Sequence, residues 1–139
     1  MSKSKQKIKL LLFIVLFIFI SCKDESYFTQ VYDKQLVKVP ISCLKLKLTP
    51  FNQDIYRSVE KLYNFTSDDC KYTLKIKYKT NIGCNSPYNT NKSFHKFIEL
   101  DLLYQNKLIY TVYKDLRDKD SIKDEIKKGY EELCKTIHL

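Results

Sequence analysis

The sequence predicts an α+β domain, a two-layer sandwich in which a mostly antiparallel four-stranded sheet carries two helices on one face, in the order β-α-β-β-β-α. Two observations lead to this prediction. Several segments alternate apolar and polar residues with a period of two, which is typical of half-buried strands. Two others repeat apolar residues every three or four positions, which is typical of helices with one buried side. Elements of these kinds bury their apolar faces by stacking in two layers.

The first strand and the first helix are expected between residues 39 and 64. Leucines alternate with lysines over residues 44–48, but the earlier apolar residues have the opposite parity, so a bulge or strand start is expected near Ser42-Cys43. Thr49 and Pro50 are suited to the N-cap and first position of a helix. The helix is expected to end near Asn64, and its apolar stripe consists of Phe51, Ile55, Val59 and Leu62.

The second half of the chain predicts three strands and a final helix. The strands are expected at residues 70–80, 97–104 and 108–113, and the polar residues 105–107 are typical of a hairpin turn. The final helix is expected to begin after Asp120 or Ser121 as N-cap. Its apolar residues at helical spacing are Ile122, Ile126, Tyr130, Leu133 and Ile137.

The first 26 residues have the pattern of an export signal. Alternating lysines precede an apolar run from Leu10 to Ile20, which is too short to span a bilayer, since a spanning helix needs about 20 apolar residues. Strongly polar residues follow at 23–26. The segment Phe19-Ile20-Ser21-Cys22 resembles the lipobox that lipoprotein signal peptidase recognises, although Phe19 stands where that pattern more often has an aliphatic residue.

This resemblance implies a lipoprotein precursor. Residues 1–21 are then the signal peptide, Cys22 carries the lipid, residues 22–38 are a tether and residues 39–139 form a single domain. Acyl chains such as palmitate hold such a protein on a membrane, because each buried methylene contributes about 0.8 kcal/mol. Lys23 in the second mature position favours the outer membrane and the periplasm over the inner membrane, and Cys22-Lys23-Asp24-Glu25 resembles a surface-export tag. The alternatives are an ordinary secretory signal and an uncleaved anchor.

The chain is basic, with a formal net charge of +9, but its basic residues do not indicate nucleic-acid binding. Of its 25 lysines and arginines, only Arg57 and Arg117 are arginines, so the guanidinium fork that recognises phosphates is almost missing. Export of the chain also argues against a nucleic-acid partner.

Four cysteines follow Cys22, and outside the cytoplasm an even number of thiols in a small domain favours disulfides. Their spacing does not resemble a zinc site. The preferred pairing is Cys70 with Cys134 and Cys43 with Cys84, because Cys70 and Cys134 are both expected beside the apolar core. Four cysteines allow three connectivities, and free buried thiols are the other possibility.

The sequence does not predict an enzyme. His95 is expected at a strand edge and His138 at the chain end, and with two glycines the chain has no phosphate-binding glycine loop. Glu99 and Asp101 share one strand face about 7 Å apart. They alternate with leucines, which indicates the solvated side of a strand more than a catalytic pair. No cofactor or metal site is predicted.

The functional surface that the sequence offers is a basic sheet face, which on adjoining strands collects Lys45, Lys47, Lys75, Lys77 and Lys79. The element order also loosely resembles small envelope lipoproteins such as the lipopolysaccharide-assembly lipoprotein LptE. We therefore expect an accessory or binding module with an envelope glycolipid or protein partner. The alternative is a small inhibitor or immunity lipoprotein that blocks a toxin or lysozyme-like enzyme through the loop Asn81–Lys92. A lysine-covered solvent face without a ligand is the simpler interpretation of the lysines.

Overall fold

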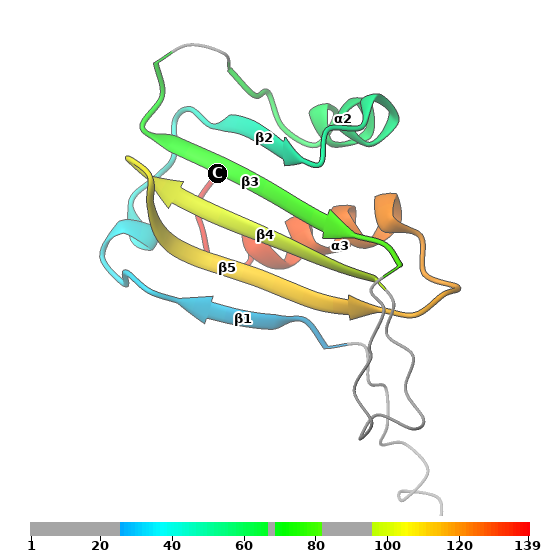
Figure 1. The fold of residues 1–139 in the computed structure, drawn as a ribbon. Helices are drawn as coiled ribbons and strands as arrows, with labels where there is room; N and C mark the ends of the chain where they lie inside the picture. Colours follow the sequence, from blue (N-terminus) through cyan, green and yellow to red (C-terminus); the bar gives the residue numbers. More distant parts are fainter. Residues whose placement is uncertain (1–25, 67–68, 82–95) are drawn as a thin grey trace, which may run out of the picture.

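The computed structural model describes residues 26–66, 69–81 and 96–139. Within them, five strands form one mixed sheet in the order β1-β5-β4-β3-β2, and helices α2 and α3 pack together with α3 lying on the sheet (Figure 1). The predicted α+β class is therefore confirmed, while the strand number differs. The elements are β1 Phe28–Val31, a 3-10 turn η1 Leu36–Lys38, β2 Lys45–Thr49, α2 Gln53–Glu60, β3 Tyr72–Lys79, β4 Lys96–Tyr104, β5 Lys107–Leu116 and α3 Ile122–Cys134.

The fifth strand corrects the expected tether over residues 22–38. Phe28–Val31 pairs antiparallel with β5, and η1 follows with Val37 buried in the core. The described residues 26–38 thus belong to the folded domain. The sequence did not reveal β1 because it is only four residues long and three of these residues are exposed, so no apolar alternation marks it.

The sheet is antiparallel except at β2, which runs parallel to β3. Helix α2 makes the crossover that a parallel pair requires. It begins later than predicted, because the N-cap is Asn52 and not Thr49: the Asn52 side-chain oxygen accepts hydrogen bonds from the backbone N–H groups of Asp54 and Ile55. Thr49 ends β2, and Phe51 stays exposed outside the helix.

The hydrophobic core lies between the sheet and the two helices. The predicted parity of β3 is confirmed for Tyr72, Leu74 and Ile76, which are buried on the helix side. Gly129 lets α3 approach β4 closely, because a Cβ at this position would lie 3.2 Å from the Leu100 Cδ1 atom. The other sheet face, covered by no described helix, is called the open face below.

A two-residue turn joins β4 to β5. Gln105 and Asn106 both have positive φ angles, 47° and 67°, as expected for a tight hairpin whose turn follows the twist of its strands. At the start of α3, Ser121 is the N-cap, which is one of the two residues predicted.

Candidate functional site

The open face brings the predicted lysines together. Because β2 and β3 are hydrogen-bonded neighbours, Lys47 lies directly opposite Lys75, and Thr49 lies opposite Lys77. Lys45 begins the same side of β2, and Lys79 is exposed at the end of β3. The lysines gather on this face because β2 and β3 adjoin, as expected from the sequence.

Lys77 is not available to a ligand, because two carboxylates of β4 hold it. Its ammonium group lies 2.7 Å from a carboxylate oxygen of Asp101 and also contacts Glu99. Burial alone would lower the pKa of Lys77, but the hydrogen bonds to Asp101 and Glu99 outweigh it and raise that pKa above the usual value. The lysine is therefore charged and paired.

The interpretation of Glu99 and Asp101 as a solvated pair is wrong for Asp101. This carboxylate is only 5% exposed and accepts a hydrogen bond of 2.6 Å from the Thr111 hydroxyl in addition to the Lys77 contact. Both oxygens are thus engaged, and the two acids act as partners of one lysine. The alternation in the sequence predicted that both acids share one face of the strand. It did not show that they lie opposite the lysines of β3, where the register pairs Lys75 with Asp101 and Lys77 with Glu99.

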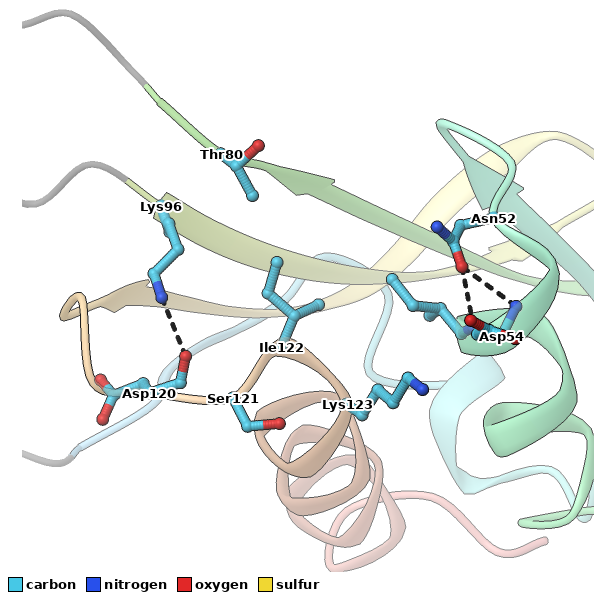
Figure 2. A pocket seen from close by; sticks show the side chains of 9 residues that line it. Asn52, Asp54, Thr80, Lys96, Asp120, Ser121, Ile122 and Lys123 are labelled. Carbon is cyan, nitrogen blue, oxygen red and sulfur yellow. Dashed lines mark hydrogen bonds between the residues drawn. The ribbon is translucent and has the colours of Figure 1, made fainter.

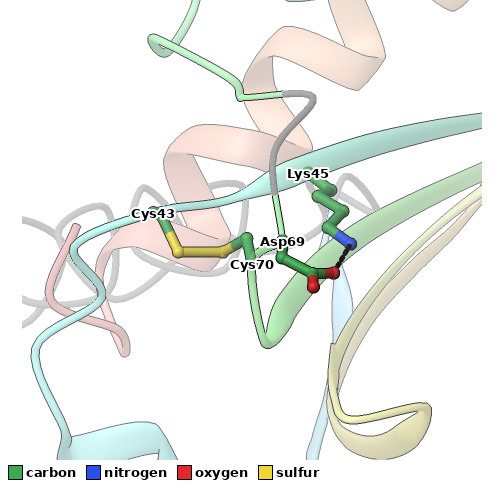
Figure 3. The surroundings of a disulfide bond; sticks show 4 residues. All are labelled: Cys43, Lys45, Asp69 and Cys70. Atoms are coloured by element: carbon green, nitrogen blue, oxygen red, sulfur yellow. Dashed lines mark ion pairs between the residues drawn. A yellow bond between two sulfur atoms is a disulfide. The ribbon is translucent and has the colours of Figure 1, made fainter.

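Three lysines of the open face have no ion-pair partner among the described residues, and they form what we call the lysine row: Lys47, Lys75 and Lys79. Lys45 differs, since it lies 3.9 Å from the carboxylate of Asp69 (Figure 3). That carboxylate is fully exposed, so water and salt screen the pair and it contributes little stability.

An aromatic cluster occupies one end of the open face, and sequence reasoning missed it. Phe28 on β1 lies opposite Tyr113 on β5, and the Tyr113 ring stacks on Phe97 of β4 with centroids 5.7 Å apart. Phe28 remains 60% exposed. A signal for this cluster was present in the sequence, because Phe97 and Tyr113 have the opposite parity to the core residues of their strands.

The disulfide joins Cys43 to Cys70, which corrects the preferred pairing of Cys70 with Cys134 and Cys43 with Cys84 (Figure 3). Each bonded cysteine lies two residues before the start of one of the two parallel strands, and the Cα atoms lie 5.9 Å apart. A parallel pair starts at one edge, so recognising the β2-α2-β3 unit would have indicated this bridge. Cys134 carries a free thiol and is exposed, and Cys84 lies outside the described residues.

A second lysine–carboxylate cluster lies under α3, on the core side of the sheet. Lys114 of β5 is 2.6 Å from Glu125 of α3, and both side chains are at most 8% exposed. The Tyr27 hydroxyl donates to Glu125 at 2.7 Å, the Tyr27 ring lies 4.8 Å from the Lys114 ammonium, and Lys128 pairs with the other Glu125 oxygen. Burial by itself raises the pKa of Glu125, but these hydrogen bonds lower it to about 2.

A shallow pocket lies where the first turns of α2 and α3 meet the end of β3 and the start of β4 (Figure 2). Two helix N-termini beside lysines suggest an anion site. However, the side chains of Asn52 and Ser121 already cap the two helices, and the Lys96 ammonium donates to the backbone carbonyls of Asp118 and Asp120. Carboxylates of Asp54 and Asp120 also line the pocket. The donors of the two helix N-termini and of Lys96 are therefore used within the protein, and Asp54 lines the same pocket as Lys123.

Other chemistry receives no support from residues 26–66, 69–81 and 96–139. They contain no group of three potential metal-ligating side chains, and none of their helices has the length and apolarity that crossing a membrane requires. His138 is exposed, whereas His95 and the loop proposed for an inhibitor, apart from Asn81, lie outside the described residues. No family model, curated protein or solved structure matches this chain.

Proposed function

We propose that the chain is a cell-envelope protein anchored by acyl chains on Cys22, that it acts as a non-catalytic binding module, and that its lysine row contacts phosphate groups of an anionic envelope lipid or glycolipid. One observation carries the ligand class: Lys47 and Lys75 lie directly opposite each other on the open face without a carboxylate partner among the described residues. Like charges at this spacing repel, and a bound anion removes the repulsion.

The disulfide supports the export part of the proposal. Structural disulfides persist in oxidising compartments and are rare in the cytosol. Cys43–Cys70 closes a 27-residue separation between two core strands, so a reducing compartment would remove a cross-link worth about 3 kcal/mol. This agrees with the expected envelope location, in which the outer membrane and the periplasm are favoured by the residues after Cys22.

The anchor is tested by metabolic labelling with a palmitate analogue. The wild type should incorporate label and lose its signal peptide, whereas Cys22→Ala should remain an unlabelled precursor. Equal labelling of the two proteins contradicts the lipoprotein assignment.

The binding face is tested by reversing the lysine row in a chain that starts at residue 22 and carries Cys22→Ser, so that no acyl chain contributes. The protein with an unchanged lysine row should co-sediment with vesicles containing anionic phospholipid at low salt. It should be released at high salt, because screening shortens the reach of surface charges. Lys47→Glu, Lys75→Glu and Lys79→Glu together should abolish this binding. Lys77 stays unchanged, because reversing it would place a third carboxylate beside Glu99 and Asp101.

A matched control separates the face from net charge. The triple variant Lys34→Glu, Lys61→Glu and Lys127→Glu makes the same charge change on exposed lysines outside the five strands. It should keep most of the binding. Equal loss in both triple variants would assign the effect to overall charge, and absence of wild-type binding would leave the lysine row as a solvated surface.

A further inference from the structure

The folded domain begins very close to the proposed lipid. Three residues separate Cys22 from Ser26, the first described residue. A fully extended chain spans at most about 14 Å between their Cα atoms, whatever its conformation. If Cys22 is acylated, Ser26 therefore lies within that distance of an atom at the membrane surface.

The start of the domain is also firmly attached to its core. The Tyr27 hydroxyl donates to both the side chain and the backbone carbonyl of Glu125, and the next residue begins β1. The chain therefore has no slack after Tyr27 that would let the domain move away from the anchor.

The aromatic cluster lies at this same end of the sheet. Figure 1 shows that the start of β1, the end of β3, the start of β4 and the end of β5 meet there. In register terms, Phe28 pairs with Tyr113, and Phe97 pairs with both Asp115 and the exposed Lys79. An exposed phenylalanine beside a tyrosine and a lysine is the combination that favours a membrane–water interface, where aromatic rings lie at the headgroup level and lysines meet lipid phosphates.

We propose that this end of the sheet rests on the bilayer that holds Cys22, with the Phe28 ring inserted at the interface. The inference rests on the proposed lipid anchor and adds an orientation to it. The opposite end, with the Gln105-Asn106 turn and the disulfide, then faces away from the membrane.

The chain has no tryptophan, so a single introduced tryptophan reports the environment of one position. Phe28→Trp places the reporter in the aromatic cluster. Tyr32→Trp is the matched control, because Tyr32 is 55% exposed and follows the opposite end of β1. Both acylated proteins are reconstituted into vesicles with and without brominated phospholipid, and flotation measures the anchored fraction.

Interfacial insertion reaches about 5–10 Å into the bilayer, so brominated lipid should quench at least about half of the tryptophan emission of Phe28→Trp. The emission of Tyr32→Trp should fall by only about a tenth, because this position lies outside that depth. Both variants should unfold at the wild-type urea concentration. Floating protein with equal quenching at the two positions, or with none, overturns the orientation and leaves the lipid anchor intact. Protein that does not float overturns the anchor and, with it, this inference.

Discussion

The two lysine–carboxylate clusters have nearly the same chemistry on opposite faces of the sheet. Under α3, Lys114 and Glu125 are 8% and 5% exposed at their side chains. On the open face, the Lys77 side chain is 33% exposed and contacts Glu99 and Asp101. The first cluster joins a strand to a helix across the core, whereas the second joins neighbouring strands at the surface.

This difference shows how burial decides the use of a charged pair. A buried pair is strongly coupled, and removing one partner leaves a charge without solvation. An exposed pair gains little, because water competes for both partners. The cluster under α3 is therefore structural, while the one on the open face neutralises Lys77 and leaves the lysine row without an ion-pair partner among the described residues.

The largest expected effect comes from breaking the buried pair. Glu125→Leu alone should lower the free energy of unfolding by about 3–5 kcal/mol, because the buried Lys114 ammonium loses its carboxylate. Lys114→Met should cost somewhat less, about 3 kcal/mol, because Lys128 and the Tyr27 hydroxyl still contact Glu125. The two substitutions together should restore it to within about 1 kcal/mol of the wild type. Urea unfolding of the four proteins gives the coupling energy. Additive losses in the double variant would show that the two side chains are not coupled.

The next largest effect is expected from lowering the pH, which should reduce the free energy of unfolding by protonating Glu125 of the same pair. The pKa of Glu125 is about 2 in the folded chain and 4.5 in the unfolded chain, so the unfolded state binds more protons between these values. The stabilisation is fully present above about pH 4.5 and is lost as the pH falls toward 2, by at most about 3 kcal/mol. Between pH 2 and 6, the free energy of unfolding of the wild type should depend more strongly on pH than that of the variant that carries both Lys114→Met and Glu125→Leu. Parallel curves would contradict the assignment.

The open-face pair should matter less. Lys77→Met should cost about 2 kcal/mol, because it removes the cation from the buried Asp101 carboxylate, which keeps only its hydrogen bond from Thr111, while Glu99 is half-exposed to water. Urea unfolding under the conditions used for Lys114→Met makes the comparison direct. A loss as large as that of Lys114→Met would show that burial does not separate the two clusters.

The smallest effect should have the opposite sign. Lys47→Glu replaces a repulsive pair with Lys75 by an attractive one, so the free energy of unfolding should rise by about 0.2–1 kcal/mol at low salt. Lys34→Glu, on an exposed residue outside the strands, should leave it unchanged. A gain that persists in 1 M salt would not be electrostatic, since the Debye length there is about 3 Å.

Patterns within one element and the hairpin between β4 and β5 were well predicted from the sequence, whereas most relations between distant segments were not. The alternation of β3 and the stripe of α3 fixed which residues are buried, since local periodicity follows the burial of a face. The parallel pairing of β2, the Cys43–Cys70 bridge and the strand β1 depend on contacts between distant segments. Lys114 is an instructive miss: it shares the parity of the buried residues Tyr110, Val112 and Leu116, so its burial was visible in the pattern. The pairing of Lys114 with Glu125 could not be predicted, because the two residues belong to different elements.

The antiparallel pairing of β1 with β5 has a mechanical consequence. If Cys22 is held in a membrane and the lysine row holds a ligand, as proposed, tension between them enters the domain through Tyr27 and runs along β1. A pull along a strand loads its ladder of hydrogen bonds to β5 in shear, so the bonds share the force and do not open one by one. The time for which the domain withstands the load is set by its unfolding rate. Tyr27, hydrogen-bonded to Glu125, is the first point of the described fold that bears it.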